Sequence, residues 1–192
     1  LTQRLADQPP EAMARVTLYL NTARMLRRVE TLFAASEPRF LPKLRLVTDL
    51  VADPLLALPQ PIPPLRRRLQ LAELIAKLLD SQPDLAPRSA LYDLADSLAL
   101  LMDEIQGEGV PPEAIATLDV SNHSKHWERT QAFLRIIAPV FAETLDKEAL
   151  QRQAVLRLSH RWSVAPPMDP IIIAGSTGSR GTTALLMQAV AK

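Results

Sequence analysis

The chain has 192 residues, 47% of them hydrophobic and 22% charged, with a net charge of +1, so it has enough apolar side chains for one core of ordinary size. It contains no cysteine, which excludes a disulfide framework, a thiolate metal site and a cysteine nucleophile. The sequence has neither the roughly 18 consecutive apolar residues of a membrane span nor the layout of a signal peptide. We therefore expect a cytoplasmic protein with no membrane partner.

The charge is distributed unevenly along the chain. Residues 1–80 carry a net charge of +4, residues 81–120 carry −7 and residues 121–192 carry +4. Basic ends around an acidic middle fit a domain with one DNA-facing side and one side that faces solvent or a partner. An acidic helix face that simply stays in water accounts for the same pattern, and charge alone leaves both interpretations open.

Four proline pairs lie between the periodic segments, and residues 53–64 contain five prolines, which indicates an extended connector. The chain begins with leucine and ends directly after a short helical pattern, so we expect it to be a piece of a longer protein. The prolines divide it into four predicted segments: a first strand–helix unit (1–52), the connector (53–64), a helical insertion (65–164), and a returning strand, glycine-rich turn and helix (165–192).

The first predicted strand spans residues 15–20, in which apolar side chains alternate with β-forming ones (RVTLYL). Asn21 and Thr22 end this strand. A helical period of apolar residues begins at Ala23. The sequence therefore opens with a strand–turn–helix unit.

Helices are predicted through the middle of the chain. Apolar residues recur at helical spacing over 65–79 and over 91–105. Ser121 is suited to cap a third helix, and Asp146 is suited to cap a fourth. We therefore expect the insertion to be all-helical.

The last predicted strand is the apolar run at 171–174 (IIIA), which is typical of a parallel strand covered on both faces. Residues 175–181 form a glycine-rich turn, and a helix follows from about Thr182. Two strand–turn–helix units around a helical insertion indicate an α/β fold with an incomplete parallel sheet that is mostly helical overall.

Three of the five glycines lie within residues 175–183 (GSTGSRGTT), between a buried strand and a helix, which is where phosphate-binding loops occur. The spacing departs from the P-loop pattern, and Thr182 stands where the P-loop lysine would be. Contact with a phosphate or the DNA backbone and a tight structural turn both remain open. The candidate contact residues in this loop are Gly178, Ser179, Arg180, Gly181, Thr182 and Thr183.

Two other groups of polar residues have both a functional and a structural interpretation. His123 and His126 are spaced for two ligands on one helix face, but no third ligand accompanies them, so we predict no metal site. The triplet Arg66–Arg68 is typical of nucleic-acid patches, yet three consecutive helical residues spread over about 200° of a helix surface. The sequence shows no Ser-His-Asp set and no close carboxylate pair, so no catalytic residue is predicted.

Four long strings carry a family resemblance: PPLRRRLQLAELIAKLL (63–79), APRSALYDLADSLALLMDEIQGEGV (86–110), NHSKHWERTQAFL (122–134) and AGSTGSRGTTALLMQAVA (174–191). Together they resemble the N-terminal region of the AddB family in its alphaproteobacterial form. The strings occur in the family's order, and the resemblance extends over essentially the whole chain. AddB is a subunit of the AddAB helicase–nuclease, which repairs DNA double-strand breaks.

The resemblance implies a P-loop helicase-like sheet whose motor is degenerate, an AddA-type helicase–nuclease subunit as partner, and single-stranded or broken double-stranded DNA as ligand. It also implies that Asn21, Thr22 and Arg24 belong to the turn that touches the DNA backbone in helicases of this class. The strand at 171–174 is followed by no carboxylate, and the loop at 175–183 has no lysine. We therefore expect no ATP, magnesium or other cofactor in this fragment and no activity of the fragment alone, although the parent complex would be an ATP-dependent helicase and exonuclease.

Two hypotheses of function follow. In the first, the chain is a degenerate helicase-like scaffold in a double-strand-break repair subunit, and it contacts single-stranded DNA and the partner subunit. The alternative is a self-contained nucleotide- or phosphate-binding enzyme that uses the Gly175–Thr183 loop. If both predicted strands are parallel in one sheet, the turn at 21–24 and the turn at 179–180 converge on the crevice where open α/β sheets bind their ligands.

Overall fold

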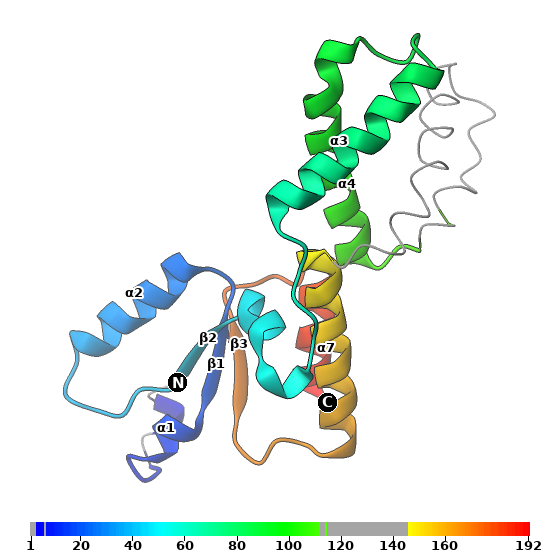
Figure 1. The fold of residues 1–192 in the computed structure, drawn as a ribbon. Helices are drawn as coiled ribbons and strands as arrows, with labels where there is room; N and C mark the ends of the chain where they lie inside the picture. Colours follow the sequence, from blue (N-terminus) through cyan, green and yellow to red (C-terminus); the bar gives the residue numbers. More distant parts are fainter. Residues whose placement is uncertain (1–2, 6, 112–113, 115–145) are drawn as a thin grey trace. The chain divides into compact units, whose positions relative to one another are not determined.

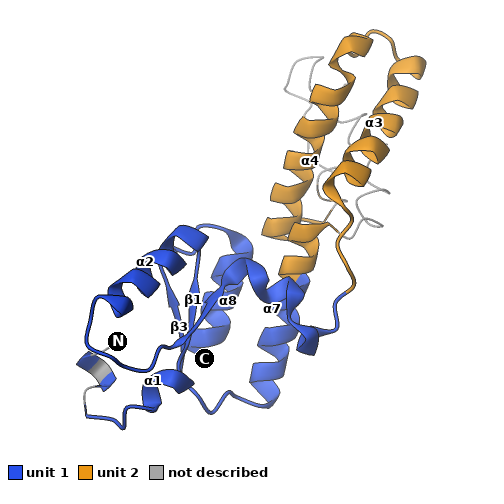
Figure 2. Ribbon diagram, turned by 60° about the vertical axis from the view of Figure 1, so that its left-hand side comes forward, with its two compact units in different colours: residues 1–58, 153–192 blue, residues 59–152 orange. Residues whose placement is uncertain are grey.

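The computed structural model describes residues 3–5, 7–111, 114 and 146–192 (Figure 1). The protein divides into two compact units (Figure 2). The α/β unit comprises residues 1–58 and 153–192, and the helical unit comprises residues 59–152. The predicted α/β fold with an incomplete parallel sheet and a helical insertion is therefore confirmed.

The α/β unit contains one sheet of three parallel strands: β1 (Thr17–Leu20), β2 (Lys43–Leu46) and β3 (Ile171–Ala174). The strand order is β2-β1-β3, so β1 is central. Each residue of β1 pairs with one residue of β2 and one of β3, from the first position to the last. All three strands therefore end at the same edge of the sheet. The sequence predicts β1 and β3 but not β2.

Helices lie on both faces of this sheet (Figure 1). Helix α2 (Ala23–Ala34) follows β1 and contacts β1 and β2. Helix α8 (Gly181–Ala191) follows β3 and packs beside the C-terminal part of α7 (Lys147–Val164). The unit also contains α1 (Ala12–Arg15) and three short 3-10 helices, at Gln3–Leu5, Val47–Ala52 and Pro54–Leu56.

The core of the α/β unit joins the sheet to α7 and α8. Tyr19 of β1 packs in one buried cluster with Val155 and Leu158 of α7 and with Leu186 of α8. This burial is why residues 153–164 belong to the α/β unit, whereas the sequence pattern places them in the helical insertion. The connection between the two units is therefore a continuous helix at this point and not a loop.

The helical unit is built around α3 (Pro64–Ser81) and α4 (Leu91–Glu108), as predicted at 65–79 and 91–105. A short 3-10 helix, Arg88–Ala90, leads into α4. The two long helices bury one cluster between them, made of Leu71, Ala72, Ile75, Leu79, Ala95, Leu98 and Met102.

The predicted helix that begins at Ser121, together with His123 and His126, lies outside the described residues. In the parts of the protein that the structure describes, no helix combines the length and the apolar character that crossing a bilayer requires.

Candidate functional site

The carboxyl ends of β1 and β3 bring two predicted turns together. Leu20 and Ala174, the last residues of these strands, are register partners. Asn21 and Gly175 therefore leave the sheet side by side. Strand β1 is central, with β2 on one side of it and β3 on the other. Open α/β sheets bind their ligands at the carboxyl ends of strands whose connections run to opposite sides in this way. The turns after β1 and β3 therefore lie together at this edge of the sheet, as the sequence predicts for two parallel strands.

The first turn is organised as the start of α2. Thr22 is the N-cap residue, and its Oγ1 accepts a hydrogen bond from the backbone N–H of Met25 at 3.2 Å. Asn21 and Arg24 are exposed on either side of it. The hydroxyl oxygen of Thr22 is therefore used at the helix end, although Thr22 is exposed as Asn21 and Arg24 are.

Met25 links the two turns. Its side chain occupies the space beside Gly175, where a Cβ would overlap the Met25 Cε and Sδ atoms. Gly175 has φ +78°, a left-handed conformation that glycine adopts without strain. The sequence pattern suggests that Gly175 leaves room for an anion. In the structure, this room is filled by the side chain of Met25.

The rest of the glycine-rich loop is irregular and contains a side-chain hydrogen bond. The Ser176 Oγ accepts a hydrogen bond from the Gly178 N–H at 3.2 Å, and Gly178 has φ +71°. Helix α8 begins at Gly181, directly after Arg180, whose side chain makes no capping hydrogen bond. Thr182 and Thr183 are buried, at 6% and 8% exposed.

The nine candidate residues thus fall into two groups. The buried or half-buried ones are Gly178, Gly181, Thr182 and Thr183. The exposed ones, which are open to a ligand from solvent, are Asn21, Thr22, Arg24, Ser179 and Arg180.

Positive charge gathers in the α/β unit. This unit contains 12 Lys and Arg against 7 Asp and Glu, a net charge of +5, whereas the helical unit contains 10 against 14, a net charge of −4. Arg24, Arg27 and Arg28 of α2 and Arg180 are all exposed, and none forms an ion pair with another described residue. The protein therefore separates its charge between the two units, and these four guanidinium groups are available to an anion.

The strand-end turns lack the residues of an ATP-binding P-loop. The sequence has Thr182 at the position of a P-loop lysine and no carboxylate after Ala174, and the space beside Gly175 is filled by Met25. Among the described residues, no group of three or more His, Cys, Asp and Glu is arranged to hold a metal ion. The groups that these turns expose to solvent are hydrogen-bonding side chains and guanidinium groups.

The basic triplet at the start of α3 is largely neutralised within the helical unit. Arg68 makes a two-point contact with the Asp96 carboxylate at 2.7 and 2.9 Å, and its guanidinium lies 5.1 Å from the centre of the Tyr92 ring. Arg67 is bonded to Asp103 at 2.8 Å. Of the three, Arg66 is exposed with no ion pair to a described residue. The triplet is therefore a connection between α3 and α4 and not a nucleic-acid patch of three free cations.

Searches for similar proteins identify no relative. No family model, no curated protein and no solved structure matches the sequence or the fold.

Proposed function

We propose that this protein is part of an AddB-type subunit of a DNA double-strand-break repair helicase–nuclease, in which the α/β unit is a scaffold that contacts the backbone of single-stranded DNA. In this proposal it performs no catalysis itself, and an AddA-type subunit supplies the motor. The proposal has two supports: the family resemblance of the sequence, and the parallel α/β architecture with its cationic strand-end turns.

One observation carries the DNA contact: the turns that hold Arg24 and Arg180 leave two neighbouring parallel strands at the same edge of the sheet. Both guanidinium groups are exposed, and Asn21 and Ser179 add exposed hydrogen-bonding groups beside them. Such groups bind phosphates without reading bases, so the contact is expected to be weak, independent of sequence and sensitive to salt.

The test is the binding of a fluorescently labelled single-stranded oligonucleotide, measured by anisotropy at about 50 mM and about 200 mM salt. The double variant Arg24→Ala/Arg180→Ala should bind more weakly than the parent and lower the salt slope by about two, because each phosphate contact contributes about one unit. The matched control is Arg15→Ala/Arg161→Ala. Arg15 lies just before the first strand, and Arg161 lies in the last turn of α7; both are exposed, and neither is ion-paired to a described residue.

Equal binding by the two double variants would show that DNA does not use the strand-end turns. Thermal unfolding of both variants at the parent's temperature would exclude a folding defect as the cause of weaker binding. The nucleotide-enzyme alternative predicts a magnesium-dependent ATPase rate that Thr182→Ala abolishes. We expect no such rate, because Thr182 is a buried residue and no lysine or carboxylate accompanies it in the loop.

A further inference from the structure

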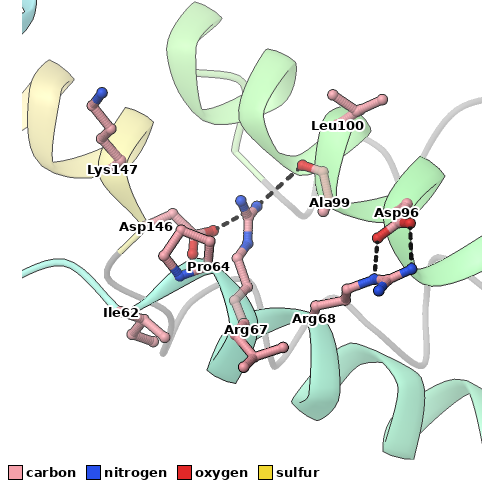
Figure 3. A pocket seen from close by; sticks show the side chains of 10 residues that line it. Ile62, Pro64, Arg67, Arg68, Asp96, Ala99, Leu100, Asp146 and Lys147 are labelled. Atoms are coloured by element: carbon pink, nitrogen blue, oxygen red, sulfur yellow. Dashed lines mark hydrogen bonds and ion pairs between the residues drawn. The ribbon is translucent and has the colours of Figure 1, made fainter. Parts of the chain in front are cut away.

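The charged side chains around a cavity in the helical unit are, except for Lys147, ion-paired to one another (Figure 3). Arg67 contacts the carboxylate of Asp146, and Arg68 contacts that of Asp96. Asp146 directly precedes α7, as the sequence predicts, and its side chain is turned toward Arg67. These pairs connect α3 with α4 and with the start of α7, so they have a structural role that needs no ligand.

The outer edge of β3, in contrast, has backbone groups that are open to a partner. Strand β3 pairs with β1 on one side, and no strand of the described residues pairs with it on the other. The N–H of Thr17 donates to the carbonyl oxygen of Pro170 at 2.9 Å, which fixes the alternation of the ladder. The N–H and C=O groups of Ile172 therefore point toward β1, and those of Ile171 and Ile173 point away from the sheet.

The two outer edges of the sheet differ in charge. Strand β2 carries two exposed cations, Lys43 and Arg45, and charges on an edge strand oppose pairing with a further strand. Strand β3 consists of three isoleucines and one alanine, all of them half-buried. β-Branched side chains favour cross-strand contacts. The β3 edge is therefore suited to receive another strand, whereas the β2 edge is not.

A second copy of β3 fits this edge in the antiparallel orientation. In an antiparallel pair, the residues that bond across the strands exchange both of their hydrogen bonds. If Ile171 faces Ile173 of the second copy, symmetry places Ile173 opposite Ile171 of that copy, and the outward groups of both residues are satisfied. The twofold axis then passes beside Ile172, which faces Ile172 of the second copy.

The side chains and charges of this pair are complementary. Ile171 and Ile173 lie on the face covered by α7 and α8, and strand alternation places Ile172 on the opposite face. On both faces, isoleucine would thus lie opposite isoleucine. Antiparallel pairing also brings the amino end of one strand, which follows the half-exposed Asp169, beside the carboxyl-end turn of the other, which contains the exposed Arg180.

We propose that this protein forms a homodimer in which the two copies of β3 pair in the antiparallel orientation and join their sheets into one continuous sheet. The contact is a single short strand, so we expect a weak dimer with a dissociation constant of about 10–1000 µM. The homodimer does not depend on the proposed DNA contact, because the outward backbone groups of β3 carry it and the residues changed to test it are different.

Sedimentation velocity of the 192-residue protein, from about 5 µM to about 1 mM, tests the association. The average mass should rise from that of the monomer toward that of the dimer. Amide hydrogen exchange gives a second readout that needs no variant. The amides of Ile171 and Ile173 should be protected only at concentrations at which the dimer forms, whereas the amide of Ile172, which is bonded to β1, should be protected throughout.

Charged substitutions at the twofold axis test the orientation and the register. Ile172→Lys and Ile172→Glu each place two like charges opposite each other, so each should weaken the dimer at least about tenfold. An equal mixture of the two variant proteins should dimerise again, because lysine then faces glutamate. Leu44→Lys is the matched control: Leu44 lies in the same row of the sheet as Ile172 but on the β2 edge, so this variant should dimerise like the parent.

Three results would each overturn the homodimer. The first is a protein that stays monomeric up to about 1 mM, which would leave the β3 edge to a strand of a different chain. The second is an Ile172→Lys variant that dimerises as well as the parent. The third is a mixture of the Ile172→Lys and Ile172→Glu proteins that stays monomeric. Recovery in the mixture requires two folded proteins, so it separates a lost contact from a folding defect. If neither variant folds, the exchange of the Ile171 and Ile173 amides in the parent decides the question.

Discussion

The side chain of Met25 occupies the space beside Gly175 in which a Cβ atom would otherwise stand. Met25 lies in the first turn of α2, after β1, and Gly175 directly follows β3. The contact therefore packs the residues that follow β1 against the residue that follows β3, although the two strands are far apart in the sequence. Gly175 also has φ +78°, so both its backbone conformation and its surroundings require glycine.

The first prediction follows from this contact. Gly175→Ala should lower the free energy of unfolding by about 1–3 kcal/mol, because the new Cβ meets Met25 and the left-handed backbone becomes strained. Gly107→Ala is the matched control: Gly107 lies within α4, and a Cβ there meets nothing within 4 Å. It should raise stability by about 0.5–1 kcal/mol, since alanine favours the helix. Urea denaturation measures both.

The steric and conformational parts of the Gly175 effect can be separated. Met25→Ala opens the space beside Gly175 and should itself be destabilising, but Gly175→Ala should cost less in that background than in the parent. If the two substitutions are additive, Met25 does not limit the size of residue 175, and only the backbone conformation does.

The three consecutive arginines of α3 give the second prediction. Arg67→Met should cost about 3–5 kcal/mol, because it leaves the buried carboxylate of Asp146 without its cation. Arg66→Ala should stay within about 0.5 kcal/mol, since Arg66 is exposed with no ion pair to a described residue. Arg68→Ala should cost far less than the Arg67 change, because its partner Asp96 is exposed to water. Equal effects at the three positions would contradict the assigned contacts.

Local patterns predicted most elements of the fold. The alternation before Asn21 and the apolar run before Gly175 marked β1 and β3, and the helical period marked α3 and α4. Strand β2 was missed because it has only four residues and lies at the sheet edge with Lys43 and Arg45 exposed. Exposed and half-buried residues alternate along β2, but four residues are too few to identify a strand from sequence. Pairing with β1 determines the extended conformation of this segment.

The functional features depended more on long-range contacts. The sequence predicted that the turns after β1 and β3 converge, because parallel strands share a carboxyl edge. No local pattern indicates that Met25 reaches Gly175 or that Asp146 meets Arg67. One signal was available, since Arg67 lies four residues before the buried Leu71 and hence on the same side of α3. The position of Arg67 on the helix could therefore have identified it as the least exposed of the three arginines.

The third prediction concerns the face of α4 that packs against α3. Leu98 is 3% exposed and lies in the cluster between the two helices, whereas Leu100, two positions later, is 67% exposed. Leu98→Ala should therefore cost about 2–5 kcal/mol. Leu100→Ala should change stability by no more than about 0.5 kcal/mol. Because residue type, helix and substitution are the same, similar costs for the two variants would mean that the buried face of α4 is assigned incorrectly.

The last prediction is a pH dependence of folding stability that arises from Asp146. Its folded-state pKa is raised, mainly by burial, so the folded protein favours the neutral carboxyl. The stabilisation from this preference is fully present below the unfolded pKa of about 3.9 and is lost as the pH rises through the raised folded value. Asparagine has nearly the same shape and does not titrate. The stability of Asp146→Asn relative to the parent should therefore increase as the pH rises through this window. Urea denaturation at a series of pH values measures it, with Asp93→Asn on the exposed side of α4 as the control for removing any carboxylate. A relative stability that decreases with rising pH would mean that Arg67 outweighs burial and that Asp146 is held in its ionised form.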